Sequence, residues 1–440
     1  MVQKNIHKKM IVLVIVFFGE ILISLSDKAI TMSTDESTNR LAVSKRLENQ
    51  ISSYPAVDEP EKRISEFIEK WDIAGASVAI TKDERLIYAK GFGYADKEAK
   101  QTVEPQHLFR VASISKLITS IAVMQLKEQG AFTLDQKVFG EEGILNNPEY
   151  RDIKDNRVKE ITVRHLLTHS AGWAQSSGDP VFMPYTIKEK MNVSLPVDIK
   201  TTIEYTLENV TLDFEPGSQS SYSNLGYAIL GEIIEKVSGM AYEDYVISKI
   251  LNPIGIYDMH LGYAEQANRF TNEVSYYSNT PFKKVYSSLR ENEIVLRQYG
   301  GNNFEVLGAA GAWVASPAEL MKLLAHIDGL PGKKDILAKE SIEEMVHSKN
   351  GFKPIGWISA DHRGLWRRTG TLAGTTALLK RQPNGVSWVM LLNTSNKHGH
   401  DFTDQMDSVM TKFLSEVENW PEYDLFNYSN PTPLYSFNEE

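Results

Sequence analysis

The chain has 440 residues, of which 42% are apolar and 24% are charged, and these values are typical of a globular protein with a sizeable core. A formal net charge of −10 argues against nucleic acid or an anionic membrane surface as a partner. Because the chain contains no cysteine, disulfide bonds, thiolate metal sites and a cysteine nucleophile are excluded.

The first 26 residues have the pattern of an export signal. The basic stretch MVQKNIHKK precedes the apolar run MIVLVIVFFG, which has the length of a signal-peptide core. Ser24 and Ser26 could supply the small residues before a cut at Asp27, although Glu20 weakens the apolar segment. The alternatives are an uncleaved membrane anchor over 10–26 and a buried helix. We expect a periplasmic or extracellular protein that contacts the membrane only if this segment stays uncleaved.

The stretch that follows predicts a tether and then the first regular elements. Residues 27–56 are polar and resemble a flexible tether. The sequence EPEKRISEFIEKW predicts an amphipathic helix, because its apolar residues recur at helical spacing: Ile64, Phe67, Ile68 and Trp71. The next stretch, GASVAITKDERLIYAKGFGYAD, predicts two strands around a charged turn at Lys82 to Arg85. From about 109 to 299 the pattern is mostly helical with long loops.

Strands return after residue 300. Ser316 and Glu319 form a capping box at the start of a helix, and TALLKRQPNGVSWVMLLN predicts a hairpin that turns at Pro383-Asn384-Gly385. An amphipathic helix over about 402–417 and a polar tail over 421–440 complete the chain. The sequence therefore predicts one α/β (α+β) domain over 57–420. Its antiparallel sheet is built from both chain ends (about 57–108 and 300–420) and is covered by terminal helices, with a mostly helical insertion (about 109–299).

Residues 109–130, FRVASISKLITSIAVMQLKEQG, predict a buried helix with two reactive side chains at its start. Ser113 and Lys116 are three residues apart, which places their side chains one turn apart on the same face. An ammonium beside a hydroxyl helps that hydroxyl to lose its proton, as a serine nucleophile requires. Ser113 could instead serve only as an N-cap. However, lysine is rarely buried without a partner, so its presence in an otherwise apolar helix favours a functional role.

Residues 214–239, FEPGSQSSYSNLGYAILGEIIEKVSG, place two polar side chains ahead of a second apolar helix. Tyr222 and Asn224 point the same way from an extended segment. A phenol near an ammonium has a lowered pKa and can act as a general base. Tyr-Ser-Asn also occurs at 277–279 and 428–430, but only Tyr222 follows a Pro-Gly turn and opens a helix.

Residues 365–375, LWRRTGTLAGT, place two arginines before Thr-Gly-Thr on a predicted strand. Strand alternation turns Arg367 and Arg368 to opposite faces, so only one of them can point into a cleft. A cation followed by Thr369, Gly370 and Thr371 suits a site that holds a substrate carboxylate. The backbone N–H of Thr371, beside a glycine, is a candidate oxyanion donor. The alternative is a hairpin edge with two solvated arginines.

Together these stretches resemble the serine β-lactamase and penicillin-binding protein family, specifically its class C branch. That branch includes class C β-lactamases, DD-peptidases, D-aminopeptidases and related esterases. The family has a Ser-x-x-Lys motif and a Lys-Thr-Gly element, and this branch has Tyr-x-Asn between them. The resemblance extends from about 57 to 418 and includes GASVAI, ITVRHLLTHSAGW, ILNPIGIYDMHLG and AAGAWVASPAELMKLL. It implies an α/β sandwich and a helical region with a cleft between them.

The resemblance also implies a role for each matching residue. Ser113 resembles the nucleophile that forms an acyl-enzyme, Lys116 its activating partner, and Tyr222 the general base. Asn224 resembles a ligand of the substrate amide. The backbone N–H groups of Ser113 and Thr371 resemble the oxyanion hole, and the family register places Arg368 in the cleft. No cofactor and no metal are implied, and the histidine pair at 165 and 169 matches a structural segment of the family.

The chain departs from the family at Arg368, where lysine or histidine is usual. Arginine keeps its charge and offers a planar fork suited to a carboxylate, but it cannot carry a proton as histidine does. We expect an exported serine hydrolase that acts on a small-molecule or peptide substrate, first a D-amino-acid or peptidoglycan-type peptide with its carboxylate on Arg368. An esterase or a β-lactamase is the alternative within enzymes. A non-catalytic binding or regulatory relative is the alternative outside them.

Overall fold

The computed structural model describes residues 41–281, 283–347 and 351–428, so the predicted export segment over 1–26 lies outside the described residues. From Val43 onward the described residues form one compact unit. The helices of this unit are α3 (Pro55–Lys70), α4 (Ser115–Glu128), α5 (Val163–Leu167), α6 (Pro184–Met191), α7 (Ile199–Asn209), α8 (Asn224–Ser238), α9 (Tyr242–Val246), α10 (Phe304–Gly311), α11 (Pro317–Leu324), α12 (Lys339–Val346) and α13 (Phe402–Glu416).

A seven-stranded antiparallel sheet is the largest sheet among the described residues, and it has the order β10-β11-β12-β13-β1-β2-β3. Its strands come from both ends of the unit, as the sequence predicted, and β13 pairs with β1 so that Ala79 lies opposite Val389. The strands of this sheet are β1 (Gly75–Lys82), β2 (Arg85–Asp96), β3 (Gln101–Thr102), β10 (Ser359–Ala360), β11 (Trp366–Leu372), β12 (Thr375–Arg381) and β13 (Val386–Leu392).

Short strands form three smaller sheets. β4 (Phe109–Arg110), β9 (Trp313–Ala315) and β5 (His260–Leu261) form one, β7 (Lys284–Tyr286) and β8 (Ile294–Leu296) form a hairpin, and β6 (Tyr277–Ser278) pairs with β14 (Thr394–Ser395). In its described residues, the insertion predicted over 109–299 therefore has mostly helical elements but also contains five short strands.

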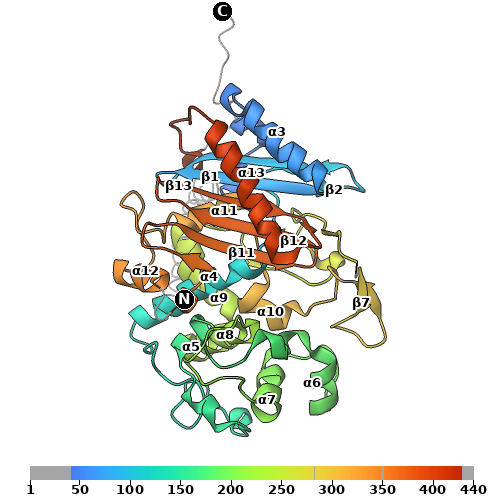
Figure 1. The fold of residues 1–440 in the computed structure, drawn as a ribbon, viewed down its shortest axis with the longest axis vertical. Coiled ribbons are helices and arrows are strands. Elements are labelled where there is room, and N and C mark those ends of the chain that lie inside the picture. Colours follow the sequence, from blue (N-terminus) through green and yellow to red (C-terminus); the bar gives the residue numbers. More distant parts are fainter. Residues whose placement is uncertain (1–40, 282, 348–350, 429–440) are drawn as a thin grey trace, which may run out of the picture. The chain divides into compact units, whose positions relative to one another are not determined.

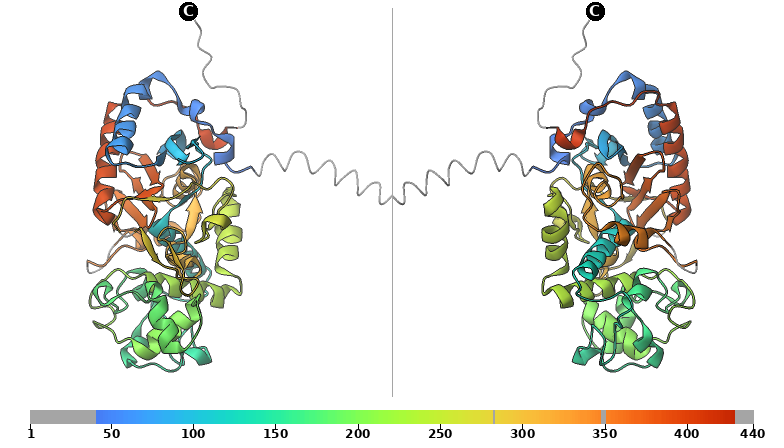
Figure 2. Two further views of the ribbon diagram at one scale, coloured as in Figure 1. Left: turned by 90° about the vertical axis from the view of Figure 1, so that its right-hand side faces the viewer. Right: turned by 90° about the vertical axis from the view of Figure 1, so that its left-hand side faces the viewer.

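Helices cover both faces of the large sheet (Figures 1 and 2). α3 and α13 pack together on one face, where Phe67 of α3 stacks on Phe402 of α13 with ring centroids 5.6 Å apart. The other face is covered by α11 and the central helices. Alternation along β1 explains this arrangement, because Val78 and Ile80 face α3 and α13 whereas Ala79 faces the central core. Both predicted terminal helices are confirmed. Ser316 caps α11 by accepting the N–H of Glu319, but the return bond from the Glu319 carboxylate that would complete the predicted capping box is not among the hydrogen bonds of the described residues.

Part of the predicted tether is an ordered part of the fold. Residues 43–54 form short 3₁₀ turns, in which Val43 and Leu47 are fully buried. The side-chain amide of Asn49 donates to the carbonyl of Val103, and its oxygen accepts the N–H of Gly91, both at 2.7 Å. The polar composition of this stretch predicted a tether, but its few apolar side chains and one amide are enough to fix it along β2.

The start of the predicted tail is also ordered. Leu425–Asn427 form a 3₁₀ turn in which Leu425 and Phe426 are buried, and the guanidinium of Arg46 donates to the carbonyl of Tyr428 at 2.7 Å.

Within the described ranges, no helix is long and apolar enough to cross a membrane.

Candidate active site

Ser113 lies in a 3₁₀ turn (Ala112–Ile114) that leads directly into α4, rather than within the helix itself. Ala112 has a φ of +46°, in the left-handed region that costs a non-glycine residue on the order of 1–2 kcal/mol. The turn is tied down by the N–H of Val111, which donates to the carbonyl of Trp313 at 3.0 Å. The backbone strain therefore falls on the residue that sets the direction of Ser113.

Lys116, in the first turn of α4, is fully buried and holds three acceptors. Its Nζ lies 3.3 Å from Ser113 Oγ, 2.8 Å from Asn224 Oδ1 and 2.6 Å from the carbonyl oxygen of Ala310. Burial lowers the pKa of Lys116, the charge of Arg368 lowers it further, and Tyr222 acts in the opposite direction. A lysine with a lowered pKa next to a serine hydroxyl is suited to exchange a proton with it.

Tyr222 lies just before α8, and its hydroxyl donates to Ser113 Oγ at 2.7 Å. Burial raises the pKa of this phenol, but the charges of Lys116 and Arg368 outweigh burial and lower the pKa to about 8. The ring of His169 stacks on the phenol ring at 4.5 Å between centroids. A phenol with this pKa next to Ser113 is suited to act as a general base near neutral pH.

Asn224 is fixed from both ends of its side chain. Its Oδ1 accepts from Lys116, while its Nδ2 and its backbone N–H donate to Oδ2 of Asp179 at 3.0 and 2.8 Å. Asp179 was missed from the sequence. It precedes Pro180, and an Asp-Pro pair indicates only the start of a turn, which is also present here. Nothing in that local pattern indicates a contact with a residue 45 positions away.

Arg368 and Arg367 do point to opposite faces of β11. Arg368 is buried, and its guanidinium donates to the carbonyl of Ser113 at 2.7 Å and to the hydroxyl of Tyr222 at 3.3 Å. Arg367 pairs with Asp404 at 2.6 Å. Across the described ranges, no carboxylate lies within 4.0 Å of the Arg368 guanidinium. The site therefore contains a buried arginine and a buried lysine without a directly paired acid.

Gly370 allows β11 to approach the Ser113 turn. A Cβ on this residue would lie 2.2 Å from the carbonyl oxygen of Val111 and 3.1 Å from the nitrogen of Ser113. Thr369 and Thr371 lie on either side of it, and Thr371 lines the same small cavity as Ser113. The structure therefore brings all eight residues predicted from the three motifs to one place.

Gly370→Ala is expected to lower the free energy of unfolding by about 1–3 kcal/mol, because the new methyl group would push the Ser113 turn away from β11. Denaturant unfolding of purified protein measures this loss. Gly308→Ala is the matched control, since a Cβ there meets only Leu261 at 3.9 Å. Equal stabilities of the two variants would show that the close approach at Gly370 is unimportant.

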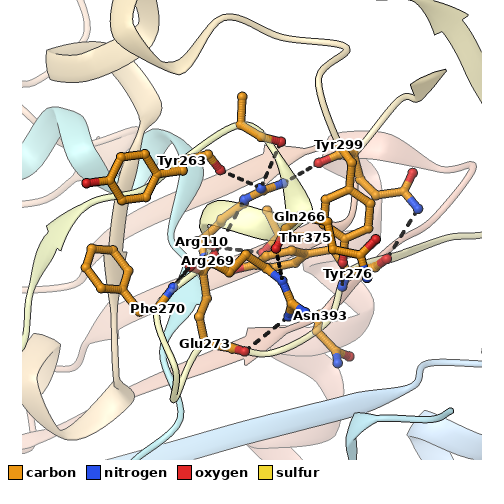
Figure 3. A network of polar contacts seen from close by, with 12 residues as sticks. Arg110, Tyr263, Gln266, Arg269, Phe270, Glu273, Tyr276, Tyr299, Thr375 and Asn393 are labelled. Atoms are coloured by element: carbon orange, nitrogen blue, oxygen red, sulfur yellow. Dashed lines mark hydrogen bonds and ion pairs between the residues drawn. The ribbon is translucent and has the colours of Figure 1, made fainter. Parts of the chain in front are cut away.

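A buried polar network holds the strand that leads to Ser113 (Figure 3). The guanidinium of Arg110 donates to the carbonyl oxygens of Gln298 and Tyr263 and lies 4.1 Å from the centre of the Tyr276 ring. The hydroxyl of Tyr276 accepts the N–H of Arg110 and donates to Glu273, whose carboxylate lies 3.8 Å from the guanidinium. The network fixes the chain three residues before Ser113.

Three cavities meet at this site. The smallest has a volume of about 140 Å³ and is lined by residues that include Ser113, Tyr222, Asn224 and Thr371. A cavity of about 330 Å³ extends past Arg368, and one of about 570 Å³ extends past Thr371 in the other direction. A larger cavity, about 770 Å³, is lined by none of the predicted site residues. The histidines at 165 and 169 each accept a backbone N–H, and no three His, Asp or Glu residues in the described part are grouped to hold a metal ion.

Comparisons with known proteins identify relatives of this chain. The family model described as Beta-lactamase matches residues 61–407. Penicillin-binding protein 4* of Bacillus subtilis (strain 168) is 30% identical over 171 residues, which are 39% of this chain and 34% of that protein. The chain spans about a third of the length of the curated relatives it matches.

Solved structures show the same fold. The octameric penicillin-binding protein homologue from Pyrococcus abyssi is 27% identical, with a TM-score of 0.57 over 78% of this chain and 75% of that one. The D-amino acid amidase from Ochrobactrum anthropi SV3, complexed with L-phenylalanine amide, has a TM-score of 0.60 over 82% of this chain and 99% of that one. At 20% identity, this second likeness shows the fold alone.

Proposed function

This chain belongs to the β-lactamase family, and on that premise we propose that it is a serine acyl hydrolase that forms an acyl-enzyme at Ser113. The observation that carries the proposal is the environment of Ser113 Oγ, which lies 2.7 Å from the hydroxyl of Tyr222 and 3.3 Å from Nζ of Lys116. A serine hydroxyl needs a neighbouring base to become a nucleophile, and both candidates are within reach.

The steps follow from these contacts. The proton of Ser113 Oγ passes to Tyr222 or Lys116 as Oγ bonds to the substrate carbonyl carbon. With a pKa of about 8, about a tenth of Tyr222 is ionised at pH 7. The backbone N–H groups of Ser113 and Thr371 receive the oxyanion. The leaving group takes the proton as its bond to the carbonyl carbon breaks. Water then attacks the acyl carbon and gives a proton to the same base. As the bond from that carbon to Ser113 Oγ breaks, the base returns the proton to Oγ.

The position of Arg368 favours a substrate whose leaving group carries a carboxylate. The buried Arg368 guanidinium, which has no acid paired with it among the described residues, lies beside a cavity of about 330 Å³ that is also lined by Ser113. Guanidinium binds carboxylate strongly because the two planar groups share charge-assisted hydrogen bonds. We therefore place a small amide or peptide first, with a D-amino-acid or peptidoglycan-type peptide as the leading class. Simple esters and β-lactams come next.

A non-catalytic binding protein is the second candidate. The arginine at 368 favours it, because the usual lysine or histidine is absent and the arginine is already bonded to the carbonyl of Ser113. Against it, Lys116 contacts both Ser113 and Asn224, and Tyr222 contacts Ser113. Binding alone does not require a buried lysine and a phenol of lowered pKa around one hydroxyl.

A fluorophosphonate should label the wild-type protein on Ser113. The serine oxygen displaces fluoride from phosphorus and leaves a stable phosphonyl ester. Mass spectrometry of a proteolytic digest should find the added mass on the peptide that contains Ser113. If neither a fluorophosphonate nor a fluorescent penicillin labels the folded protein, the non-catalytic candidate gains and the hydrolase proposal fails.

Arg368→Lys should raise KM more for a substrate with a carboxylate on its leaving group than for the methyl ester of that carboxylate. Acetyl thioglycolate and its methyl ester form such a pair. The difference should be about 5- to 30-fold, the value of a charge-assisted hydrogen bond of about 1–2 kcal/mol. Any displacement of Ser113 affects both substrates, so their ratio isolates the carboxylate. Arg367→Lys is the matched control and should leave the ratio within twofold; equal effects of the two variants would contradict this role.

A further inference from the structure

The cavity of about 570 Å³ continues the site beyond Thr371. It shares Phe182, Thr371 and Leu372 with the small cavity that contains Ser113. The cavity beside Arg368 approaches Ser113 from residues 367–369 of the same strand. A substrate that crosses Ser113 therefore places one part in each of these two cavities, on either side of Gly370.

Aromatic side chains form one wall of this larger cavity. Tyr185 of α6 and Tyr286 of β7 meet edge to face, with ring centroids 6.1 Å apart and an interplanar angle of 64°. Tyr286 is 64% exposed and Phe182, nearer Ser113, is 42% exposed. Exposed ring faces that line a cavity gain most from covering by another ring, since aromatic pairs combine burial with favourable edge contacts.

The wall is fixed before any ligand binds. The hydroxyl of Tyr185 donates to the carbonyl of Ser287 at 2.9 Å, and Lys188 pairs with Glu291 at 3.0 Å, so two contacts join α6 to the β7–β8 hairpin. At the base of the hairpin, a Cβ on Gly301 would lie 2.9 Å from the side chain of Val285. Because these side chains are already ordered, ligand binding loses little free energy to fixing them in place.

The charge of the lining restricts the ligand further. Among the described residues, those that line this cavity include Arg297 and Lys397 but no aspartate or glutamate. In a chain with a net charge of −10, this composition disfavours a cation in the cavity.

We propose that this cavity is the acyl-group subsite and takes an aromatic ring that carries no positive charge. The inference rests on the proposed acyl transfer at Ser113 and names its substrate class. The substrate has an arylacetyl-like acyl group on the Tyr286 side and a carboxylate-bearing leaving group on the Arg368 side.

Two thioesters test the acyl preference: phenylacetyl thioglycolate and acetyl thioglycolate. Both release thioglycolate, and because the protein contains no cysteine, a thiol reagent detects the product without background from the protein. After correction for spontaneous hydrolysis, wild-type kcat/KM should be at least tenfold higher for the phenylacetyl compound. Tyr286→Ala should reduce this ratio to below threefold. Tyr94→Ala removes an exposed tyrosine outside the cavity lining and should leave the ratio unchanged.

A binding experiment separates the subsite from the chemistry. Calorimetry with the Ser113→Ala variant should give a Kd for N-phenylacetylglycine at least tenfold below that of N-acetylglycine. Phenylglycylglycine, which has the same length but carries an ammonium on the carbon between the ring and the carbonyl, should bind at least threefold more weakly than N-phenylacetylglycine. In the Ser113→Ala/Tyr286→Ala double variant, N-phenylacetylglycine and N-acetylglycine should bind with equal Kd.

The outcomes distinguish the two proposals. Thioesters that are not hydrolysed, together with tighter binding of N-phenylacetylglycine, would contradict the hydrolase and leave the subsite in place. Equal affinity for the phenylacetyl and acetyl ligands, a preference that survives Tyr286→Ala, or tighter binding of phenylglycylglycine would overturn the subsite.

Discussion

Replacing Ser113 by alanine is expected to lower kcat/KM for thioester and amide substrates by at least about 10⁴-fold. Loss of the nucleophile from a serine catalytic unit removes nearly all of the acceleration that the unit provides. The same oxygen is the atom that both Lys116 and Tyr222 reach. Initial rates with purified protein over a range of substrate concentrations measure the change.

A second serine provides the control. Ser248 is exposed, and its hydroxyl only donates to the carbonyl of Asp244 within its own helical turn at 2.6 Å. Ser248→Ala should keep wild-type kinetics. Thermal unfolding of the Ser113→Ala variant should remain close to wild type. A variant that is folded and retains more than a tenth of the activity would contradict the role of Ser113.

Lys116→Met should lower kcat by about 10³-fold, within the range known for loss of a positioned acid–base group. Methionine has a similar length and suits the buried position, so the substitution removes the amine rather than the packing. It leaves Asn224 Oδ1 and the carbonyl of Ala310 without their donor, and we expect a loss of about 1–3 kcal/mol of stability as well. Steady-state kinetics and denaturant unfolding measure the two effects separately.

The pH profile of the Lys116→Met variant gives a more specific readout. Burial raises the pKa of Tyr222, whereas Lys116 and Arg368 together bring it down to about 8, so removing Lys116 moves the pKa upward. A rate that depends on ionised Tyr222 then rises at higher pH than in wild type. Lys127→Met, at the other end of α4, removes a lysine that pairs with Glu344 and should leave the profile unchanged. An unshifted profile for Lys116→Met would exclude Tyr222 as the titrating base.

Local sequence patterns were sufficient to predict the elements that depend mainly on residues close together in the sequence. The hairpin at 82–85 turns on Asp83 and Glu84, both with positive φ, and the later hairpin turns at Gly385 with a φ of +78°. The helix that follows Tyr222 ends at Gly239, whose φ of +69° is the usual left-handed cap. The spacing of Ser113 and Lys116 likewise placed both residues at one end of a buried helix.

Features that depend on distant packing were not predictable in this way. Nothing about an alanine at 112 indicates a left-handed backbone, because only the contacts around the turn hold it there. Asp179 reaches Asn224 only once the turn that Asp179 opens has packed against the start of α8. The polar stretch before α3 becomes ordered through single residues such as Leu47, which an average over composition hides.

The pairing of β13 with β1 has a consequence for how the protein folds. Ala79 lies opposite Val389, so the middle of the sheet joins positions 310 residues apart (389 minus 79). Contacts this distant form slowly, because a long loop must close first. At a synthesis rate of about 5–20 residues per second, the first hairpin waits about 15–60 s for its partner strand to be made. The sheet that supports β11 and the site is thus completed only after nearly all of the described chain has been synthesised, and the first hairpin needs protection from aggregation until then.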